Sequence, residues 1–315
     1  ILEAGGLFLM NTRVTDIITE GGRVSGVATS GGEKYTASEI ILATGHSARD
    51  IYSILLNRGI DMEMKTFAMG VRVEHPQELI DRIQYHGKPR GKYLPAAAYT
   101  LATQSAGRGV YSFCMCPGGF MVPSATSPGE VVVNGMSPSR RNSPWANSGI
   151  VAEIREEDAM RYGGGVLAGL NYQSLLEKQA WQEGGMSQRA PAQRLVDFVE
   201  GRSSSSLPKG SYFPGLTPSR LHEWLPEEMS SRLREGFREF GRKMRGYLTN
   251  DALVAAVESR TSSPVRITRD PDNLNALNIS GLYPAGEGAG YAGGIVSSAV
   301  DGMQAAEKIA EKHVG

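Results

Sequence analysis

The stretch LYPAGEGAGYAGG, residues 282–294, decides the fold of this chain. Its first four residues are typical of the end of a short strand, and glycines dominate the nine that follow: Gly286, Gly288, Gly290, Gly293 and Gly294. Because glycine has no Cβ, such a turn lets the backbone lie directly against another segment or a flat ligand. Residues 295–312 then predict a helix whose apolar face is formed by Ile295, Ala299, Met303, Ala306 and Ile309.

The amide groups at the start of that helix favour negative charge, because they have no partners within the helix and lie at its positive end. A reduced flavin carries such charge across N1 and the C2 carbonyl. A tight turn that packs the helix against the strand and holds no ligand explains the spacing equally well. The glycines alone therefore leave both interpretations open.

The opening residues have the same α/β character. Four strands are predicted, the last of them buried: 12–19, 23–29, 33–37 and 40–43. The fourth strand ends at Thr44-Gly45 and leads into a helix, in which residues 51–55 have helical spacing and which Gly59 ends. We therefore expect the first and last segments of the chain to form one compartment.

The middle of the chain has a different composition, in which Gly and Pro interrupt the apolar stretches. It predicts β-structure, helices and polar loops. The predicted strands lie in 66–75 and 98–136, the helices in 77–85, 166–183 and 226–245, and the loops in 139–148 and 202–206. We place one domain in residues 1–64 and 276–315 and a second, inserted domain in 65–275.

Composition excludes several classes of protein. The 315 residues contain 33 Lys+Arg and 33 Asp+Glu, so the net charge of zero provides no general attraction to nucleic acid or an anionic membrane. No stretch is apolar and long enough for a spanning helix. Two cysteines form no disulfide framework, so we expect a reducing, cytoplasmic location.

A dinucleotide-binding motif is missing from the beginning of the chain. No G-x-G-x-x-G follows a strand there, and the spacing of Gly286, Gly288 and Gly290 is different. The first residue is Ile1 rather than Met. We therefore expect this chain to be a piece of a longer protein that lacks the pyrophosphate site and is inactive alone.

Four motifs, in the same order, resemble a known family along nearly the whole chain. They are ILATGHSARD (41–50), SFCMCPGG (112–119), ESRTSSPVRI (258–267) and YPAGEGAGYAGGI (283–295). The chain resembles the bacterial FAD-dependent proteins of the "NAD(FAD)-utilizing dehydrogenase" type. The resemblance implies an α/β fold: a partial FAD-binding, Rossmann-like domain of glutathione-reductase type, interrupted by a large mixed β/helical insertion.

The resemblance also implies the cofactor and its contacts. The cofactor is FAD, held in the full-length protein, with NAD(P)H as a candidate electron donor. Glu287 matches the acidic residue, often Asp in relatives, that holds the flavin ribityl chain. The matched cofactor-binding positions are Ala43, Thr44, Gly45, Gly286, Glu287, Gly290, Tyr291, Ala292, Gly293, Gly294 and Ile295.

Other residues are candidates for chemistry. Cys114 and Cys116 form a C-x-C pair, which fits a redox dithiol or half a metal site, but two buried thiols beside a Pro-Gly-Gly turn explain it better. Because the five histidines have no paired spacing, we expect no metal site. His46 and Arg49 follow a strand end, where ligands bind in α/β sheets. Arg260 and Arg266 fit anion binding or, slightly better, structural ion pairs.

Three functions remain open. The first is an FAD-dependent oxidoreductase of unknown substrate. The second is a flavin-dependent RNA-modifying protein, but its basic stripe, Arg234, Arg238 and Arg242, is interleaved with glutamates and fits a solvated helix face better, so we expect no nucleic-acid partner. The third is a binding module without catalysis. The substrate and the oligomeric state are not encoded in any motif.

Overall fold

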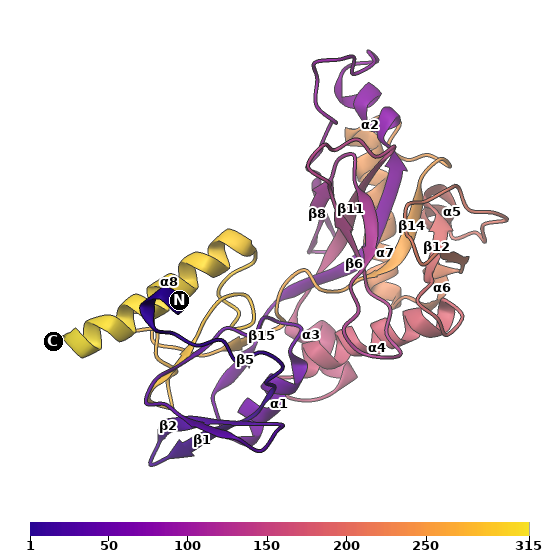
Figure 1. Ribbon diagram of the computed structural model, residues 1–315. Helices are drawn as coiled ribbons and strands as arrows, with labels where there is room; N and C mark the ends of the chain where they lie inside the picture. The colour runs from indigo at the N-terminus through magenta and orange to yellow at the C-terminus, as the bar shows by residue number, and fades with distance from the viewer. Residues whose placement is uncertain (315) are drawn as a thin grey trace. The chain divides into compact units, whose positions relative to one another are not determined.

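The computed structural model describes residues 1–314 and divides into two compact units (Figure 1). Unit 1 comprises Ile1–Lys65, Gly164–Leu170 and the residues from Ser262 onward, and unit 2 comprises Thr66–Gly163 and Asn171–Thr261. The predicted class, an α/β unit interrupted by a mixed insertion, is confirmed. The boundary expected at 275/276 instead falls at 261/262, because β15 (Val265–Ile267) pairs with β5 (Met62–Met64) of the opening segment.

Unit 1 holds three small sheets. Its elements are η1 (Leu2–Ala4), β1 (Val14–Glu20), β2 (Arg23–Thr29), β3 (Lys34–Thr36), β4 (Ile40–Leu42), α1 (Arg49–Asn57), β5, β15, β16 (Leu282–Pro284) and α8 (Ile295–Val314). The β1-β2-β3 sheet is antiparallel, β16 and β4 run parallel, and β15 and β5 run antiparallel. All four predicted opening strands are present.

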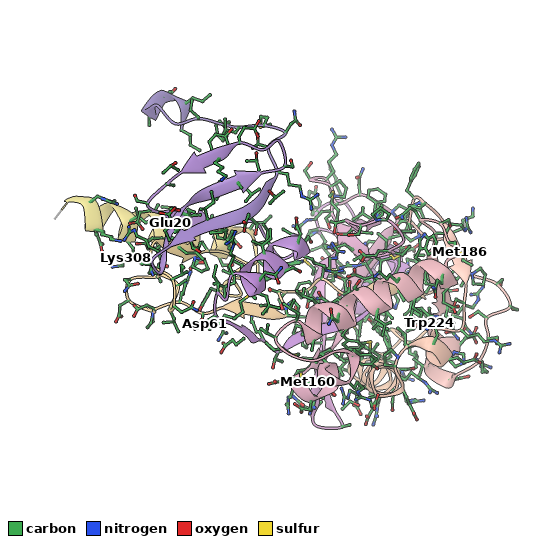
Figure 2. All side chains as sticks on the ribbon, turned by 90° about the horizontal axis from the view of Figure 1, so that it is seen from below. Glu20, Asp61, Met160, Met186, Trp224 and Lys308 are labelled. Atoms are coloured by element: carbon green, nitrogen blue, oxygen red, sulfur yellow. The ribbon has the colours of Figure 1, made fainter. Side chains whose placement is uncertain are left out.

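The β1–β2 hairpin follows directly from its sequence. Gly21 and Gly22 form a two-residue loop in which φ is +56° and +76°, the positive pair that glycine adopts without strain. Glu20, at the end of β1, is labelled in Figure 2 and pairs with Arg23 across the loop. Alternating Val, Ile and Thr residues then allow Ile17 and Val24 to face the core while their neighbours remain more exposed.

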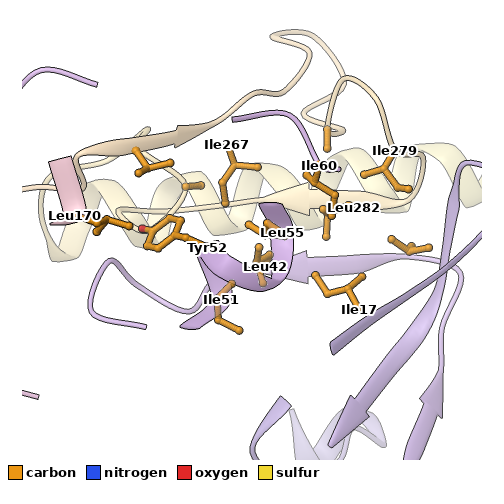
Figure 3. Packing of buried hydrophobic residues seen from close by; sticks show 14 residues of the cluster. Ile17, Leu42, Ile51, Tyr52, Leu55, Ile60, Leu170, Ile267, Ile279 and Leu282 are labelled. Carbon is orange, nitrogen blue, oxygen red and sulfur yellow. The ribbon is translucent and has the colours of Figure 1, made fainter. Parts of the chain in front are cut away.

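The core of unit 1 draws on segments from both ends of the chain (Figure 3). Leu42 of β4, Leu55 of α1 and Leu282 of β16 belong to one buried cluster, together with Ile267 of β15 and Leu170. Each fully buried side chain of this size contributes about 1.5–3 kcal/mol to folding. The opening and closing segments therefore stabilise each other, as their shared α/β character predicts.

The final helix, α8, begins at Ile295 as predicted but turns a different face to the protein. The expected apolar face is wrong: Ile295 is 91% and Met303 63% exposed. Asp301 and Ala305 are the buried positions, and Ala305 packs with Tyr283 and Ala285. The helix is rotated this way because Asp301 forms an ion pair and a hydrogen bond beneath it.

Unit 2 is built on a seven-stranded sheet with the order β13-β12-β14-β6-β11-β8-β7, in which only β12 and β13 are parallel. Its elements are β6 (Phe67–Pro76), α2 (Gln77–Gln84), β7 (Ala102–Ser105), β8 (Arg108–Cys116), β9 (Phe120–Pro123), β10 (Val133–Met136), β11 (Trp145–Ile154), α3 (Glu156–Ala159), η2 (Met160–Tyr162), α4 (Ala168–Glu183), β12 (Ala190–Arg194), α5 (Leu195–Glu200), β13 (Leu216–Pro218), α6 (Leu221–Trp224), α7 (Glu227–Lys243) and β14 (Leu253–Glu258). The first turn of α4, up to Leu170, belongs to unit 1.

The central strands of this sheet are buried along almost their whole length. Nine of the ten residues of β6 and all six of β14 are buried. Helix α7 contacts β7, β8 and β11, and both strands of the β9–β10 pair contact the same sheet. The buried residues of β6 include Arg72, Glu74 and His75, so burial here is not confined to apolar side chains. The predicted helices α2, α4 and α7 are confirmed, whereas the loop expected over 139–148 ends where β11 begins at Trp145.

No helix within residues 1–314 combines the length and the apolar character that crossing a lipid bilayer requires.

Candidate functional site

The end of β4 and the glycine-rich turn lie side by side in unit 1. Strand β16 pairs in parallel with β4, with Leu282 opposite Ile40 and Pro284 opposite Leu42. The Ala285 amide then donates a hydrogen bond of 3.0 Å to the Leu42 carbonyl. Because both strands run in the same direction, the segments that follow them, 43–45 and 286–294, emerge at one edge of the sheet. That edge is where ligands bind in open α/β sheets.

Two glycines of the turn are required by close backbone contacts. A Cβ on Gly288 would stand 2.6 Å from the carbonyl carbon and oxygen of Gly45. A Cβ on Gly290, whose φ is +85°, would stand 2.8 Å from the Val265 carbonyl oxygen. No side chain fits at either position without moving backbone. The turn therefore packs against the end of β4 and against β15 chiefly through main-chain atoms.

A buried ion pair supports the turn from below. Asp301 of α8 accepts a hydrogen bond of 2.6 Å from the Gly286 amide and pairs with both terminal nitrogens of Arg269, at 2.6 and 3.1 Å. Burial alone would raise the pKa of Asp301, but the hydrogen bonds from Arg269 and Gly286 outweigh it and keep the pKa below its usual value. The Arg269 guanidinium also lies 3.8 Å from the ring centre of Tyr291. Tyr291, predicted to bind cofactor, therefore also braces the turn.

Tyr52 provides a second brace that the sequence does not reveal. Its hydroxyl donates a hydrogen bond of 2.7 Å to the Gly288 carbonyl and lies 3.0 Å from the Ser263 hydroxyl. Burial is the main reason that its pKa is raised. Tyr52 is on α1, at the apolar helical spacing that predicts only core packing. Its partners are more than two hundred residues away, so no local pattern indicates this contact.

His46 and Glu287 form the polar part of the site. His46 Nδ1 lies 3.0 Å from Glu287 Oε1, and the two side chains are 14% and 27% exposed. The His46 Nδ1 atom is buried and makes no hydrogen bond of good geometry among the described residues. Arg49 is the first residue of α1, directly after this loop, and its charge acts on Tyr52. The structure thus brings His46, Arg49 and Glu287 to the same edge.

The start of α8 is open. A Cβ on Gly293 would meet nothing within 4 Å, and one on Gly294 would meet only the Ser297 hydroxyl, at 3.8 Å. Ile295 and Val296 are 91% and 76% exposed. The first amides of a helix have no intrahelical acceptor, so this end of α8 presents N–H groups and the positive end of the helix dipole.

Lys65 is a candidate that sequence reasoning missed. It follows β5, and its amide donates to the Pro264 carbonyl at 2.9 Å. Burial lowers the pKa of its ammonium, the charge of Arg266 lowers it further, and Glu287 opposes both. Arg266, considered above for anion binding, pairs with Glu63 at 2.9 Å, while its buried Nε has no hydrogen-bond partner among the described residues. Lysine has no periodic signature, so only the structure places Lys65 near Glu287.

Three predicted candidates belong to unit 2. Arg260 is 4% exposed and pairs with Glu130 at 3.2 Å and Glu177 at 3.0 Å, so the structural ion-pair interpretation holds for it. Cys116 is buried and donates to the Cys114 carbonyl at 3.3 Å, whereas Cys114 is exposed with φ at +47°. Burial raises the pKa of Cys116, which is opposite to what a reactive redox thiol requires.

No group of three or more His, Cys, Asp or Glu residues within 1–314 is arranged to hold a metal ion.

A family model covers the inserted unit, unit 2. The model described as "FAD-dependent protein, C-terminal domain-like" matches residues 66–261. The chain belongs to this family. A second model, "Glucose inhibited division protein A", matches residues 1–106 of this FAD-dependent family member.

Individual relatives are longer than this chain. An uncharacterized protein of Clostridium beijerinckii is 42% identical over 99% of the chain, and the chain spans 58% of that protein's length. Among solved structures, an oxidoreductase of Methanosarcina mazei has a TM-score of 0.36 and 12% identity, covering 94% of this chain and 49% of that one. Aquifex aeolicus GidA has a TM-score of 0.35 and 12% identity, covering 95% and 44%. Both structural likenesses are too weak to support a functional conclusion.

Proposed function

We propose that unit 1 contributes the flavin-facing part of an FAD site, and that the complete protein is an FAD-dependent oxidoreductase. One observation carries the proposal. The end of β4 and the glycine-rich turn meet through bare backbone, at the edge of the sheet where α8 presents its open N-terminus. The family's description as FAD-dependent supports the same cofactor.

The residues of unit 1 at this edge fit an FAD molecule. Gly293 and Gly294 leave open space before α8, and the buried His46 Nδ1 lacks a hydrogen-bond partner of good geometry among the described residues. Glu287 would accept hydrogen bonds from ribityl hydroxyls, and the segment 43–45 would lie along the cofactor. The FAD, when bound, supplies the hydride and electron chemistry.

The chain's own residues set the electrostatics of the site. The first amides of α8 and its dipole favour negative charge by about 0.3–1 kcal/mol, rising to about 2 kcal/mol where water is partly excluded. Lys65 holds its proton less tightly than an ordinary lysine because it is half-buried beside Arg266. Lys65 therefore releases its proton to a bound group more readily than an ordinary lysine would. NAD(P)H as the electron donor stays a prediction.

The test is the absorbance spectrum of the full-length protein that contains this chain. The purified protein should show the two visible bands of oxidised flavin, or gain them when FAD is added. Absence of both results would reject the FAD proposal and favour the binding module without catalysis.

A matched pair of variants assigns the site to the glycine-rich turn. Glu287→Gln should lower the fraction of protein that retains FAD, because it removes a charged acceptor at the edge of β4. Glu307→Gln changes an exposed residue of α8, away from the turn, and should retain FAD as the wild type does. Equal retention by both variants would place the cofactor elsewhere.

The basic stripe that the RNA-modifying alternative would need is engaged in contacts within the protein. The Arg234 and Arg238 side chains both donate to the Val199 carbonyl, at 3.0 and 2.8 Å, and Arg242 pairs with Glu239. Arg234 and Arg238 thus serve the packing of α7 on the end of α5, and Arg242 is paired within α7. Binding of the full-length protein to RNA at several salt concentrations tests this, since phosphate contacts produce a steep loss of affinity with salt.

A further inference from the structure

Unit 2 contains a pocket that the proposed function does not use. It has a volume of about 650 Å³ and lies where the C-terminal ends of α2 and α7 meet the segment 99–101. Pockets that hold small ligands usually span about 300–1,000 Å³. The size alone therefore admits a ring-bearing small molecule.

The floor of the pocket is apolar. Tyr99, Leu101 and Met244 line it and are at most 8% exposed, and Leu79 and Ile83 of α2 are partly buried beside them. On the side away from the pocket, Tyr99, Leu101 and Met244 pack into the interior of unit 2. Tyr99 stacks edge-on against Tyr247, with ring centres 5.5 Å apart. An aromatic or aliphatic group can therefore lie on a preformed surface.

The rim of the pocket is basic. Its charged or titratable side chains are Arg82, His86, Lys243 and Arg245, and none of the lining residues is Asp or Glu. Arg82 pairs with the exposed Glu78, and Lys243 donates to the Ala102 carbonyl. Within residues 1–314, the side chains of His86 and Arg245 make no hydrogen bond or ion pair, so both remain available to a ligand.

The negative ends of the two helix dipoles neutralise only part of the positive charge on the pocket rim. Two helices end here, and each C-terminus carries a negative charge of roughly one half, which favours nearby cations. Three permanently charged side chains face those two ends, and Glu78 offsets one of them. Roughly one positive charge remains uncompensated, before His86 is counted. The rim therefore exceeds what capping α2 and α7 requires.

We propose that this pocket binds a small amphipathic anion. The apolar body of the ligand lies on Tyr99, Leu101 and Met244, and its carboxylate, phosphate or sulfonate group is held by Arg245 and His86. The apolar floor favours a small molecule over a polyanion, whose phosphates need a basic track rather than a hydrophobic base. This site is independent of FAD binding by unit 1.

The test uses two fluorescent dyes on the full-length protein. Anilinonaphthalene sulfonate carries the anionic group, and phenylnaphthylamine has the same rings without it. Arg245→Gln should weaken binding of the sulfonate dye at least about tenfold, because the variant removes a charge-assisted hydrogen bond to the sulfonate. The same variant should leave phenylnaphthylamine binding unchanged.

Two further variants locate the dyes. Thr100→Trp places a large side chain at the exposed edge of the pocket and should weaken binding of both dyes. Arg140→Gln removes an exposed arginine of the same unit that does not line the pocket, and should change neither dye. Circular dichroism of each variant establishes that it is folded.

Several results would overturn the proposal. In one, Arg245→Gln binds the sulfonate dye as tightly as Arg140→Gln does. In another, both dyes lose affinity equally in Arg245→Gln, which would show that the charge is not recognised. In a third, a single-stranded RNA oligomer displaces the sulfonate dye while decanoate does not, which would assign the surface to a polyanion.

Discussion

Gly288 lies so close to Gly45 that a Cβ on Gly288 would stand 2.6 Å from the Gly45 carbonyl carbon. Two segments more than two hundred residues apart in the sequence therefore meet without any side chain between them. Because β4 and β16 run parallel, this contact fixes where the turn lies relative to the end of β4. The proposed cofactor position depends on this placement, because Glu287 lies in the turn and α8 begins directly after it.

Gly288→Ala should destabilise the protein and reduce its FAD content. The added methyl group must displace backbone at Gly45, and overpacking of this kind costs about 1–3 kcal/mol. Gly302→Ala is the matched control: Gly302 lies within α8, and a Cβ there meets nothing within 4 Å. Alanine in a helix interior is favoured by about 0.5–1 kcal/mol, so Gly302→Ala should raise the melting temperature slightly. Equal melting temperatures for Gly288→Ala and wild type would refute the contact.

Local patterns in the sequence were sufficient for the elements that carry the site. The β1–β2 hairpin, α1 and the start of α8 all follow from short-range signals: alternating β-branched residues, helical spacing and glycine turns. The meeting of the two chain ends also follows, because both have the texture of an α/β unit. These features depend on neighbours in the sequence or on composition.

The braces of the site could not be predicted in the same way. Tyr52, Arg269 and Asp301 act through partners distant in the sequence, and nothing in their own segments distinguishes them from core or surface residues. The face of α8 was misjudged for a related reason. Apolar spacing selected Ile295 and Met303, but the hydrogen bond and ion pair of Asp301 rotate the helix away from that face.

At near-neutral pH, Lys65 should react with acetic anhydride faster than a lysine of ordinary pKa that is equally buried. Its lowered pKa increases the fraction of neutral amine, which is the reactive form. Lys34, exposed on β3, serves as the internal reference in mass spectrometry at limiting reagent. Because Glu287 raises the pKa of Lys65, Glu287→Gln should increase the acetylation of Lys65 further.

Protection completes the test of Lys65. If unit 1 faces the flavin, adding FAD to the full-length protein should reduce acetylation at Lys65 and leave Lys34 unchanged. A Lys65 that reacts no faster in Glu287→Gln than in wild type would contradict its placement near the carboxylate.

The two cysteines should differ sharply in reactivity. Cys114 is exposed, whereas Cys116 is 8% exposed and burial raises its pKa, so an aromatic disulfide reagent should modify one thiol in the folded protein and the second after denaturation. Cys114→Ser should abolish the fast phase, and Cys116→Ser should retain it. Rapid modification of both thiols in the folded wild type would revive the redox-dithiol hypothesis.

Glu74 should make the stability of unit 2 depend on pH. This β6 carboxyl is 2% exposed and accepts hydrogen bonds from the Ser211 amide, at 2.7 Å, and hydroxyl. Burial raises its pKa from 4.5 to about 7, against the effect of those hydrogen bonds. The folded state therefore binds the proton more tightly than the unfolded state does. Its stabilising effect is complete below pH 4.5 and is lost as the pH rises through about 7.

In the wild type, the neighbouring His75 offsets the pH dependence of stability that Glu74 causes. Burial lowers the pKa of His75 from 6.5 to about 4, although its ring nitrogen lies 2.8 Å from the Tyr247 carbonyl. Its contribution is complete above pH 6.5 and is lost as the pH falls through about 4. Between those values the two groups change the free energy of unfolding in opposite directions and largely cancel.

Glu74→Gln separates the two effects. Relative to wild type, its free energy of unfolding should rise by about 3 kcal/mol between pH 4.5 and a pH above 7, since each pKa unit corresponds to about 1.4 kcal/mol. Urea unfolding at a series of pH values measures this difference. Glu227→Gln, at the exposed start of α7, is the control and should leave the pH profile unchanged. A difference between Glu74→Gln and wild type that stays constant with pH would show that Glu74 is ionised in the folded protein.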